Sequence, residues 1–197
     1  MKSVWLFLGL LVVIGCQKTI QNPEAYLENL LAHPQIFQEG VVEYRLNYLP
    51  MDYFMARELK NHSQPDNQIN RDSLKSVVVN QYGGGTYYLL RLVLDSANRE
   101  NPQAKASLSE KMMRFQSQQE EIRMEISGHL KNGNTIHPDI LIVDSDWITK
   151  SGATILFSFR KQDASGLKRM EFGKSFVVAE NWMVEASKLE PRIRLKG

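Results

Sequence analysis

The chain has little of several features that would assign it to a function. It contains one cysteine, Cys16, among 197 residues, so no internal disulfide can form. No charge sign dominates, because 24 lysines and arginines face 22 aspartates and glutamates. A net charge of +2 gives no case for the strongly basic surface that nucleic-acid binding requires, and we expect no nucleic-acid partner. No apolar run reaches the roughly 20 residues of a membrane-spanning helix.

Motifs that carry catalysis or bind cofactors are also missing. The sequence has no Cys–His or Cys–Cys spacing typical of a metal centre and no Gly-x-Ser-x-Gly elbow. Gly83-Gly84-Gly85 lacks the lysine and Ser/Thr of a phosphate-binding loop and indicates a turn before a strand. Glu120 and Glu121 are better explained as a charged strand face than as an acid/base pair. We therefore predict no catalytic, cofactor-binding or metal-binding residue, which favours a non-enzymatic protein over an enzyme.

Two small groups of side chains were considered as metal ligands. Asn132-Gly133 predicts a hairpin turn. His129 and His137 flank this turn, and with Asp139 they could hold a divalent ion across the hairpin, although separate surface histidines explain them more simply. Asp139, Asp144 and Asp146 offer carboxylate oxygens of the kind calcium takes. They lack the glycine and the distal glutamate of a calcium loop, which favours a solvated turn at a strand end.

What is present at the N-terminus is more specific. After Lys2, an apolar run of about ten residues extends from Trp5 to Ile14, the length of a secretory signal. The run ends in Val13-Ile14-Gly15-Cys16, which resembles the lipobox of bacterial lipoprotein precursors. That resemblance implies cleavage before Cys16 and acylation of its thiol. Cys16 is thus the predicted lipid-attachment residue, and two or three acyl chains on one residue would anchor the protein durably.

The resemblance to a lipoprotein precursor also implies segment boundaries in the chain and a cellular location for the protein. We expect residues 1–15 to be a signal peptide, residues 16–22 the lipidated cysteine with its tether, and residues 23–197 a single β-rich globular domain. The bacterial cell envelope is the implied location. Gln17, rather than Asp, follows the cysteine, and in enterobacteria-like lipoproteins this indicates the outer rather than the inner membrane.

The pattern of apolar residues predicts short elements along the mature chain. Asn22 is a suitable N-cap for a helix that begins at Pro23. Segment 86–94 is almost continuously apolar, which predicts a strand buried on both faces, and polar segment 96–107 is predicted to be a mobile loop. We predict helices over 23–31, 51–60 and 109–119. We predict strands over 42–48, 74–79, 86–94, 120–130, 140–143, 155–160, 170–172, 176–179 and 192–196. For 120–130 a helix is the alternative, because Ile122 and Ile126 also fit a helix face with Met112 and Phe115.

Many short strands separated by turn signals favour a mainly β fold. We predict a single antiparallel β-sandwich-like domain with short helices near its N-terminal end. A small β-barrel and an α+β arrangement are the alternatives.

These observations favour a membrane-anchored binding or accessory module without catalytic activity. Its partners would be the membrane, through the lipid, and an envelope protein or glycan. Two alternatives stay open: an envelope hydrolase acting on glycan or peptidoglycan, and a small-molecule (lipid) carrier. A deep apolar cavity would favour the carrier, and a cleft with converging polar side chains the enzyme.

Overall fold

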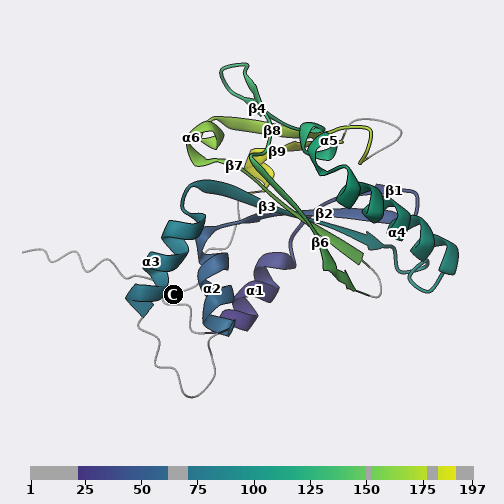
Figure 1. Cartoon of the computed structure of the whole chain (residues 1–197), viewed down its shortest axis with the longest axis horizontal. Helices are drawn as coiled ribbons and strands as arrows, with labels where there is room; N and C mark the ends of the chain where they lie inside the picture. Colours follow the sequence, from purple (N-terminus) through teal and green to yellow (C-terminus); the bar gives the residue numbers. More distant parts are fainter. Residues whose placement is uncertain (1–21, 62–70, 150–151, 177–181, 190–197) are drawn as a thin grey trace, which may run out of the picture.

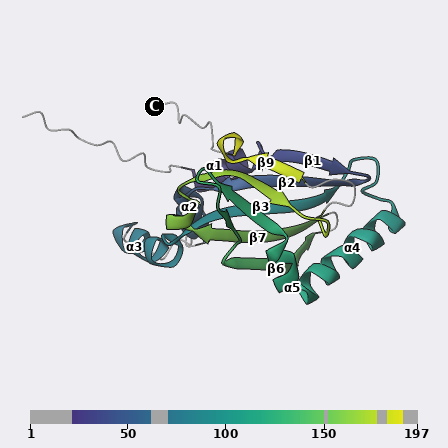
Figure 2. The same cartoon turned by 90° about the horizontal axis from the view of Figure 1, so that it is seen from above.

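Two antiparallel sheets form the centre of the protein (Figure 1). The computed structural model describes residues 22–61, 71–149, 152–176 and 182–189, with the backbone alone for 71 and 144–149. In Figure 1 helices α1, α2 and α3 lie below the larger sheet, and the smaller sheet lies above it. Figure 2, seen from above, shows α4 and α5 along one side of the sheets. The predicted antiparallel β-sandwich-like arrangement is therefore confirmed.

The larger sheet has five strands and the smaller has four. The order of the larger sheet is β1 (Gln35–Glu39), β2 (Val42–Leu49), β3 (Gly85–Leu94), β7 (Gly152–Arg160), β6 (Ile140–Thr149). The order of the smaller sheet is β5 (Thr135–Ile136), β4 (Ile126–Leu130), β8 (Leu167–Phe172), β9 (Trp182–Glu185).

Helices are more extensive than the sequence indicated and are not confined to the N-terminal end. They are α1 (Pro23–Leu31), α2 (Met51–Asn61), α3 (Arg71–Tyr82), α4 (Pro102–Ser117), α5 (Gln119–Met124), α6 (Lys161–Ala164) and the 3₁₀ turn η1 (Ala186–Lys188). In the described part of the chain, none of these helices has the length and apolar character needed to cross a membrane.

Strand β3 is buried on both faces, as predicted. Leu90 and Leu92 belong to the main core, which fills the space between the two sheets and α4. Tyr87 and Leu89 point to the opposite face and join a second cluster with α1, α2 and α3. The apolar character of β3 is therefore explained by packing inside the protein, and it does not require a bound lipid.

Helix α1 has the predicted start, and it is held on the larger sheet at its end. The Asn22 side chain accepts a hydrogen bond of 3.0 Å from the backbone N–H of Ala25. At the C-terminal end, Nη2 of Arg91 donates to the carbonyl of Leu31 at 2.8 Å, and Nδ2 of Asn47 donates to the carbonyl of Leu30 at 3.2 Å. Two side chains from neighbouring strands thus bind carbonyl groups that the helix leaves unpaired.

The predicted strand over 74–79 is wrong, because this segment lies inside α3. Its β-branched residues favour a strand locally, but Leu74 and Val78, four residues apart, are the ones that are buried. Val77 and Val79 are exposed. Packing against α2 at helical spacing therefore overrides the local preference.

Two further boundaries needed correction. The polar segment 96–107 is partly the start of α4, where Asn101 caps the helix and Pro102 occupies its first turn. The predicted strand over 120–130 is divided, because α5 ends at Met124 and β4 begins at Ile126. In α4, Leu108, Met112 and Phe115 are buried on one side, which explains why the whole segment folds as a helix.

The other predictions are mixed. Strands β2, β3, β6, β7 and β8 and helix α2 lie where they were predicted, within a few residues, except that β6 extends to Thr149. Strands β1, β5 and β9, helix α6 and the 3₁₀ turn η1 were not predicted. Phe176 lies in a turn rather than a strand, and residues 177–179 and 192–196 are outside the described residues.

Candidate functional site

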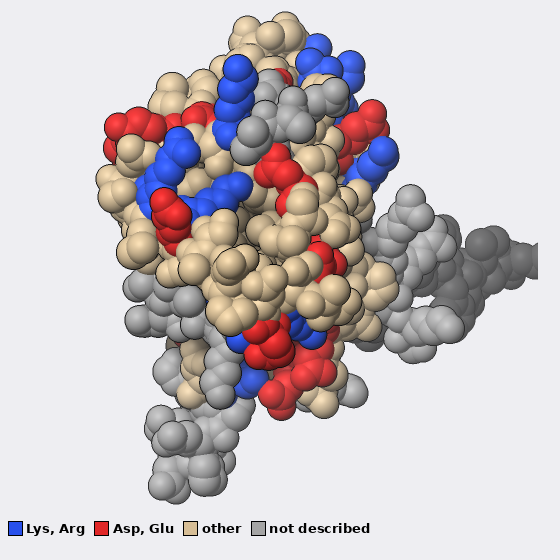
Figure 3. All heavy atoms as spheres, turned by 90° about the vertical axis from the view of Figure 1, so that its right-hand side faces the viewer, with Lys and Arg blue, Asp and Glu red and all other residues tan. Residues whose placement is uncertain are grey.

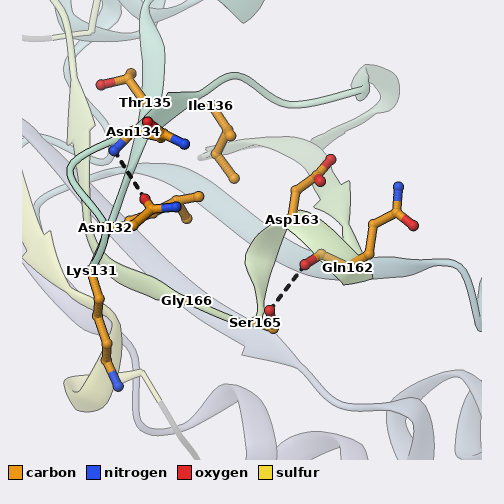
Figure 4. Close-up of a pocket in the computed structure, with 10 residues that line it drawn as sticks. Lys131, Asn132, Asn134, Thr135, Ile136, Gln162, Asp163, Ser165 and Gly166 are labelled. Atoms are coloured by element: carbon orange, nitrogen blue, oxygen red, sulfur yellow. Dashed lines mark hydrogen bonds between the residues drawn. The ribbon is translucent and has the colours of Figure 1, made fainter.

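A polar pocket of about 560 Å³ lies between the turn of the β4–β5 hairpin and the turn that joins α6 to β8 (Figure 4). We call it the hairpin pocket. Its volume falls within the roughly 300–1,000 Å³ of small-molecule sites. Its polar lining carries amide, hydroxyl and carboxylate groups, and two aliphatic side chains complete it. The lining residues are Leu130, Lys131, Asn132, Asn134, Thr135, Ile136, Gln162, Asp163, Ser165 and Gly166.

The hairpin wall is built by a tight turn at Asn132 and Gly133, as the sequence predicted. Gly133 has φ +88°, a left-handed conformation that glycine adopts without a steric penalty. Oδ1 of Asn132 accepts a hydrogen bond of 3.0 Å from the backbone N–H of Asn134. Since a backbone N–H can only donate, the oxygen of the Asn132 amide faces the turn. Its NH₂ group lies on the other side, toward the pocket (Figure 4).

The two walls are fixed to one another by the backbone. The N–H of Lys131 donates to the carbonyl of Gly166 at 2.8 Å. Beside this contact, the β4–β8 register shifts between His129 and Leu130, and such a bulge bends the strand that contains it. On the opposite wall, Oγ of Ser165 donates to the carbonyl of Gln162 at 3.0 Å. The pocket is therefore a preformed hollow between two short turns.

Several polar groups of the pocket are left available for a ligand. Within the described residues, no hydrogen bond or ion pair is made by the Asp163 carboxylate or by Nδ2 of Asn132. Figure 4 shows Asn132 and Ile136 on one side of the pocket, Asp163 and Gln162 on the other, and the Lys131 side chain pointing away. The pocket can thus offer a donor and an acceptor from opposite walls, beside an aliphatic surface.

A chain of polar contacts across the smaller sheet lies next to the pocket. Oγ1 of Thr135 lies 3.4 Å from Nδ1 of His129, and Nε2 of His129 lies 2.9 Å from Oε2 of Glu171. The three residues come from β5, β4 and β8 and connect neighbouring strands of the smaller sheet. Figure 4 shows the Thr135 hydroxyl turned away from Asp163. We interpret the chain as a cross-strand contact rather than a catalytic triad.

A second polar group lies between α4, the larger sheet and the turn after β8. Nζ of Lys111 donates to the carbonyl of Phe176 at 2.6 Å and to the Tyr44 hydroxyl, which itself donates to the same carbonyl. Glu39 lies 3.9 Å from the Lys111 ammonium. Burial lowers the pKa of Lys111, while Glu39 acts in the opposite direction. These groups satisfy one another and hold α4 and the turn to the sheet.

A neighbouring contact anchors the same turn. Oγ of Ser175 donates to Glu125 and accepts from Nη2 of Arg114 at 3.0 Å, and the backbone N–H of Ser175 also donates to Glu125. Ser175 is buried. A buried serine whose hydroxyl is held on both sides is a structural contact and not an accessible nucleophile.

A smaller groove of about 370 Å³ runs beside β1 and β9, strands of different sheets. Ile36 and Met183 line it, and each is 58% exposed. Phe37 stacks on Trp182 with ring centroids 5.5 Å apart, which joins the two strands on the core side. The surface charges are mixed at the end of the molecule that lies to the right in Figure 1. Figure 3 shows lysine and arginine side chains there among aspartates and glutamates, with no large patch of one sign.

The predicted metal candidates are not brought together. His129 contacts Glu171, whereas Nδ1 of His137 lies 2.9 Å from the carbonyl of Ile126. Asp139 forms an ion pair of 3.2 Å with Arg160. The side chains of Asp144 and Asp146 are outside the described residues, as is Cys16. Among the described side chains, no group of three or more His, Cys, Asp or Glu could hold a metal ion.

Sequence reasoning found the turn at Asn132 but not the pocket. The opposite wall comes from Gln162 and Asp163, about 30 residues further along the chain, and no motif links the two segments. No protein-family model, curated protein or solved structure matches this chain. The case for a function therefore rests on the N-terminal segment and on the geometry of the pocket.

Proposed function

We propose that this protein is a lipid-anchored binding module of the bacterial envelope that acts without catalysis and contacts an envelope glycan. The N-terminal segment supports the anchor, because Cys16 ends a signal-like run with the pattern of a lipobox. The hairpin pocket supports the ligand class. Sugars present many hydroxyl groups, and the pocket offers amide and carboxylate groups that can donate to them and accept from them.

The side chains that line the hairpin pocket favour a glycan over other ligand classes. Protein interfaces commonly use a buried apolar or aromatic centre, whereas polar side chains dominate this lining. Its walls carry three side-chain amides, two hydroxyl groups and one carboxylate, with only Leu130 and Ile136 as aliphatic members. Such a surface suits a polar, uncharged and hydroxyl-rich ligand better than it suits a hydrophobic peptide or a lipid chain.

The ligand class is tested by co-sedimentation of the purified full chain with insoluble cell-wall glycan. We expect the wild-type protein to sediment with the glycan and to be released by an excess of soluble glycan fragments. An unrelated insoluble polysaccharide is the control for unspecific adsorption. Recovery of all the protein in the supernatant would count against the proposed ligand class.

The anchor is tested separately with Cys16→Ser expressed in a bacterial host. We expect the variant to remain as an uncleaved or mislocalised precursor, because serine provides no thiol for acylation. Wild-type protein should partition into the detergent phase after extraction. A variant that matures and partitions like the wild type would disprove lipid attachment at Cys16.

A further inference from the structure

The hairpin pocket has a specific chemical pattern within the general class of glycan sites. We propose that it recognises the N-acetyl group of an amino sugar in the cell-wall glycan, on the side of the protein away from the membrane. This inference rests on the proposed function, and it names the chemical group that the pocket distinguishes. It is carried by the orientation of Asn132, by the unpartnered Asp163 carboxylate and by the aliphatic side chain of Ile136.

An N-acetyl group has three parts that a site can recognise: a carbonyl oxygen, an N–H and a methyl group. The Asn132 amide uses its oxygen within the turn, so its NH₂ group is the one left to donate to a ligand carbonyl. The Asp163 carboxylate can only accept when ionised, which suits the ligand N–H or a hydroxyl group. The two groups lie on opposite walls, so one ligand can contact both (Figure 4).

The methyl group finds an apolar partner between these polar groups. Ile136 points into the pocket in Figure 4 and packs against the main core on its other side. Its position is fixed by the pairing of Ile136 with Gly128 on the neighbouring strand. A plain hexose has no methyl group to cover this surface and no amide to pair with Asn132. The pocket should therefore distinguish N-acetylated sugars from glucose and from glucosamine.

The position of the pocket indicates the source of the sugar. In Figure 1 the start of α1 is at the bottom of the molecule and the β4–β5 hairpin of the smaller sheet is at the top, with the larger sheet between them. Asn22 lies six positions after Cys16, and a fully extended chain covers at most about 3.6 Å per position, or about 22 Å in all. With Cys16 acylated, this limit keeps the start of α1 within about 22 Å of the bilayer surface. The hairpin pocket, at the opposite end of the molecule, is then placed to reach the cell wall, which is why we assign the sugar to the wall and not to a membrane glycolipid.

The ligand preference can be measured by titrating the full chain, held in detergent micelles, with N-acetylglucosamine, glucosamine and glucose. Isothermal calorimetry or ligand-observed NMR gives the dissociation constants. We expect N-acetylglucosamine to bind at least about tenfold more tightly than either of the other sugars. Equal binding of glucose and N-acetylglucosamine would overturn the assignment of the N-acetyl group.

Two isosteric variants locate the contact. Asn132→Asp keeps the oxygen that the turn requires and replaces the NH₂ donor by an acceptor, and Asp163→Asn adds a donor where we expect an acceptor. Each should weaken binding of N-acetylglucosamine by about tenfold while leaving the circular dichroism spectrum and the melting temperature unchanged. Asn80→Asp is the matched control, because it makes the same isosteric change at an exposed position of α3, outside the pocket, and it should bind like the wild type. Wild-type affinity in Asn132→Asp would overturn the proposal.

Two further experiments are needed. One distinguishes a cell-wall sugar from a membrane glycolipid, and the other distinguishes failure of this pocket assignment from failure of glycan binding as a whole. Protein anchored in plain phospholipid vesicles should capture soluble cell-wall fragments, and binding only to vesicles that contain an N-acetylated glycolipid would overturn the cell-wall assignment. If the wild type and Asn132→Asp co-sediment equally with cell-wall glycan, glycan binding holds and this pocket is the wrong site. If the wild type does not co-sediment at all, the proposed function itself fails.

Discussion

The guanidinium group of Arg91, on strand β3, donates a hydrogen bond of 2.8 Å to the carbonyl oxygen of Leu31 at the end of α1. A second bond from the same Nη2 reaches Oδ1 of Asn47 at 3.3 Å, while Nε of Arg91 is buried and has no hydrogen-bond partner. Burial, together with the neighbouring Arg45, lowers the pKa of Arg91. The Arg91 side chain is therefore desolvated where it holds α1 to the central sheet.

The contribution of this contact is tested with Arg91→Met, which keeps an apolar side chain and removes the donors. A hydrogen bond to a charged group contributes about 1.5–3 kcal/mol, so the amide hydrogens of α1 should exchange at least about tenfold faster. Amide hydrogens of β7 should change less. The control is Arg45→Met, whose side chain pairs with Glu43 of the same strand at 2.6 Å. Unchanged protection of α1 in Arg91→Met would contradict the assigned role.

Removal of Tyr44 should be more costly than removal of its partner Lys111. In Lys111→Met, the Tyr44 hydroxyl still donates to the carbonyl of Phe176, so that carbonyl stays paired. In Tyr44→Phe, the largely buried ammonium of Lys111 loses an acceptor. We expect Tyr44→Phe to lower the free energy of unfolding by about 1–3 kcal/mol and Lys111→Met by less. Urea denaturation of both variants measures the order, and the reverse order would show that the ammonium carries most of the stabilisation.

The protein should lose stability in alkaline solution above pH 10. Burial, assisted by Asp52 and Tyr48, raises the pKa of Tyr26 from 10.0 to about 12. Burial also raises the pKa values of Tyr44, Tyr53 and Tyr87. A phenol whose pKa is raised on folding contributes stability that is fully present below the unfolded pKa of 10.0 and is lost as pH rises through the folded value.

For Tyr26 the window of this loss is therefore pH 10 to about 12. Thermal denaturation as a function of pH, combined with the ultraviolet absorbance of tyrosinate, measures it. Tyr26→Phe should show a shallower decline of melting temperature in this window than the wild type. A melting temperature of the wild type that is constant from pH 10 to 12 would contradict the prediction.

Gly128 is predicted to be the most sensitive glycine beside the hairpin pocket. A Cβ atom there would lie 2.9 Å from Cδ1 of Leu167, 3.0 Å from Cγ1 of Ile136 and 3.2 Å from Cε1 of Phe159. Gly128→Ala should therefore lower the free energy of unfolding by about 1–3 kcal/mol. Gly84→Ala is the matched control, because nothing lies within 4 Å of its Cβ position. Equal effects of the two substitutions on chemical denaturation would argue against tight packing at Gly128.

Local patterns in the sequence were sufficient where local physics decides the structure. Asn22 and Pro23 marked the start of α1, and Asn132 with Gly133 marked the turn that forms one wall of the pocket. The continuous apolar run of β3 predicted burial on both faces because a strand alternates its side chains between them. The lipid attachment at Cys16 remains a prediction, since that residue is outside the described structure.

Three features were decided only by the tertiary structure. Val77 and Val79 lie in a helix, segment 119–130 divides into α5 and β4, and two distant segments line the hairpin pocket. The β-branched residues of α3 are helical because Leu74 and Val78, four residues apart, are buried together on one side of a helix that packs against α2. The pocket unites Asn132 with Asp163 because the backbone of Lys131 pairs with Gly166, a contact between distant segments that no local pattern encodes. The sequence by itself determined the elements with strong local signals, and it alone is the basis for the expected location in the bacterial envelope. Long-range packing determined which polar groups meet and are left free to bind a ligand.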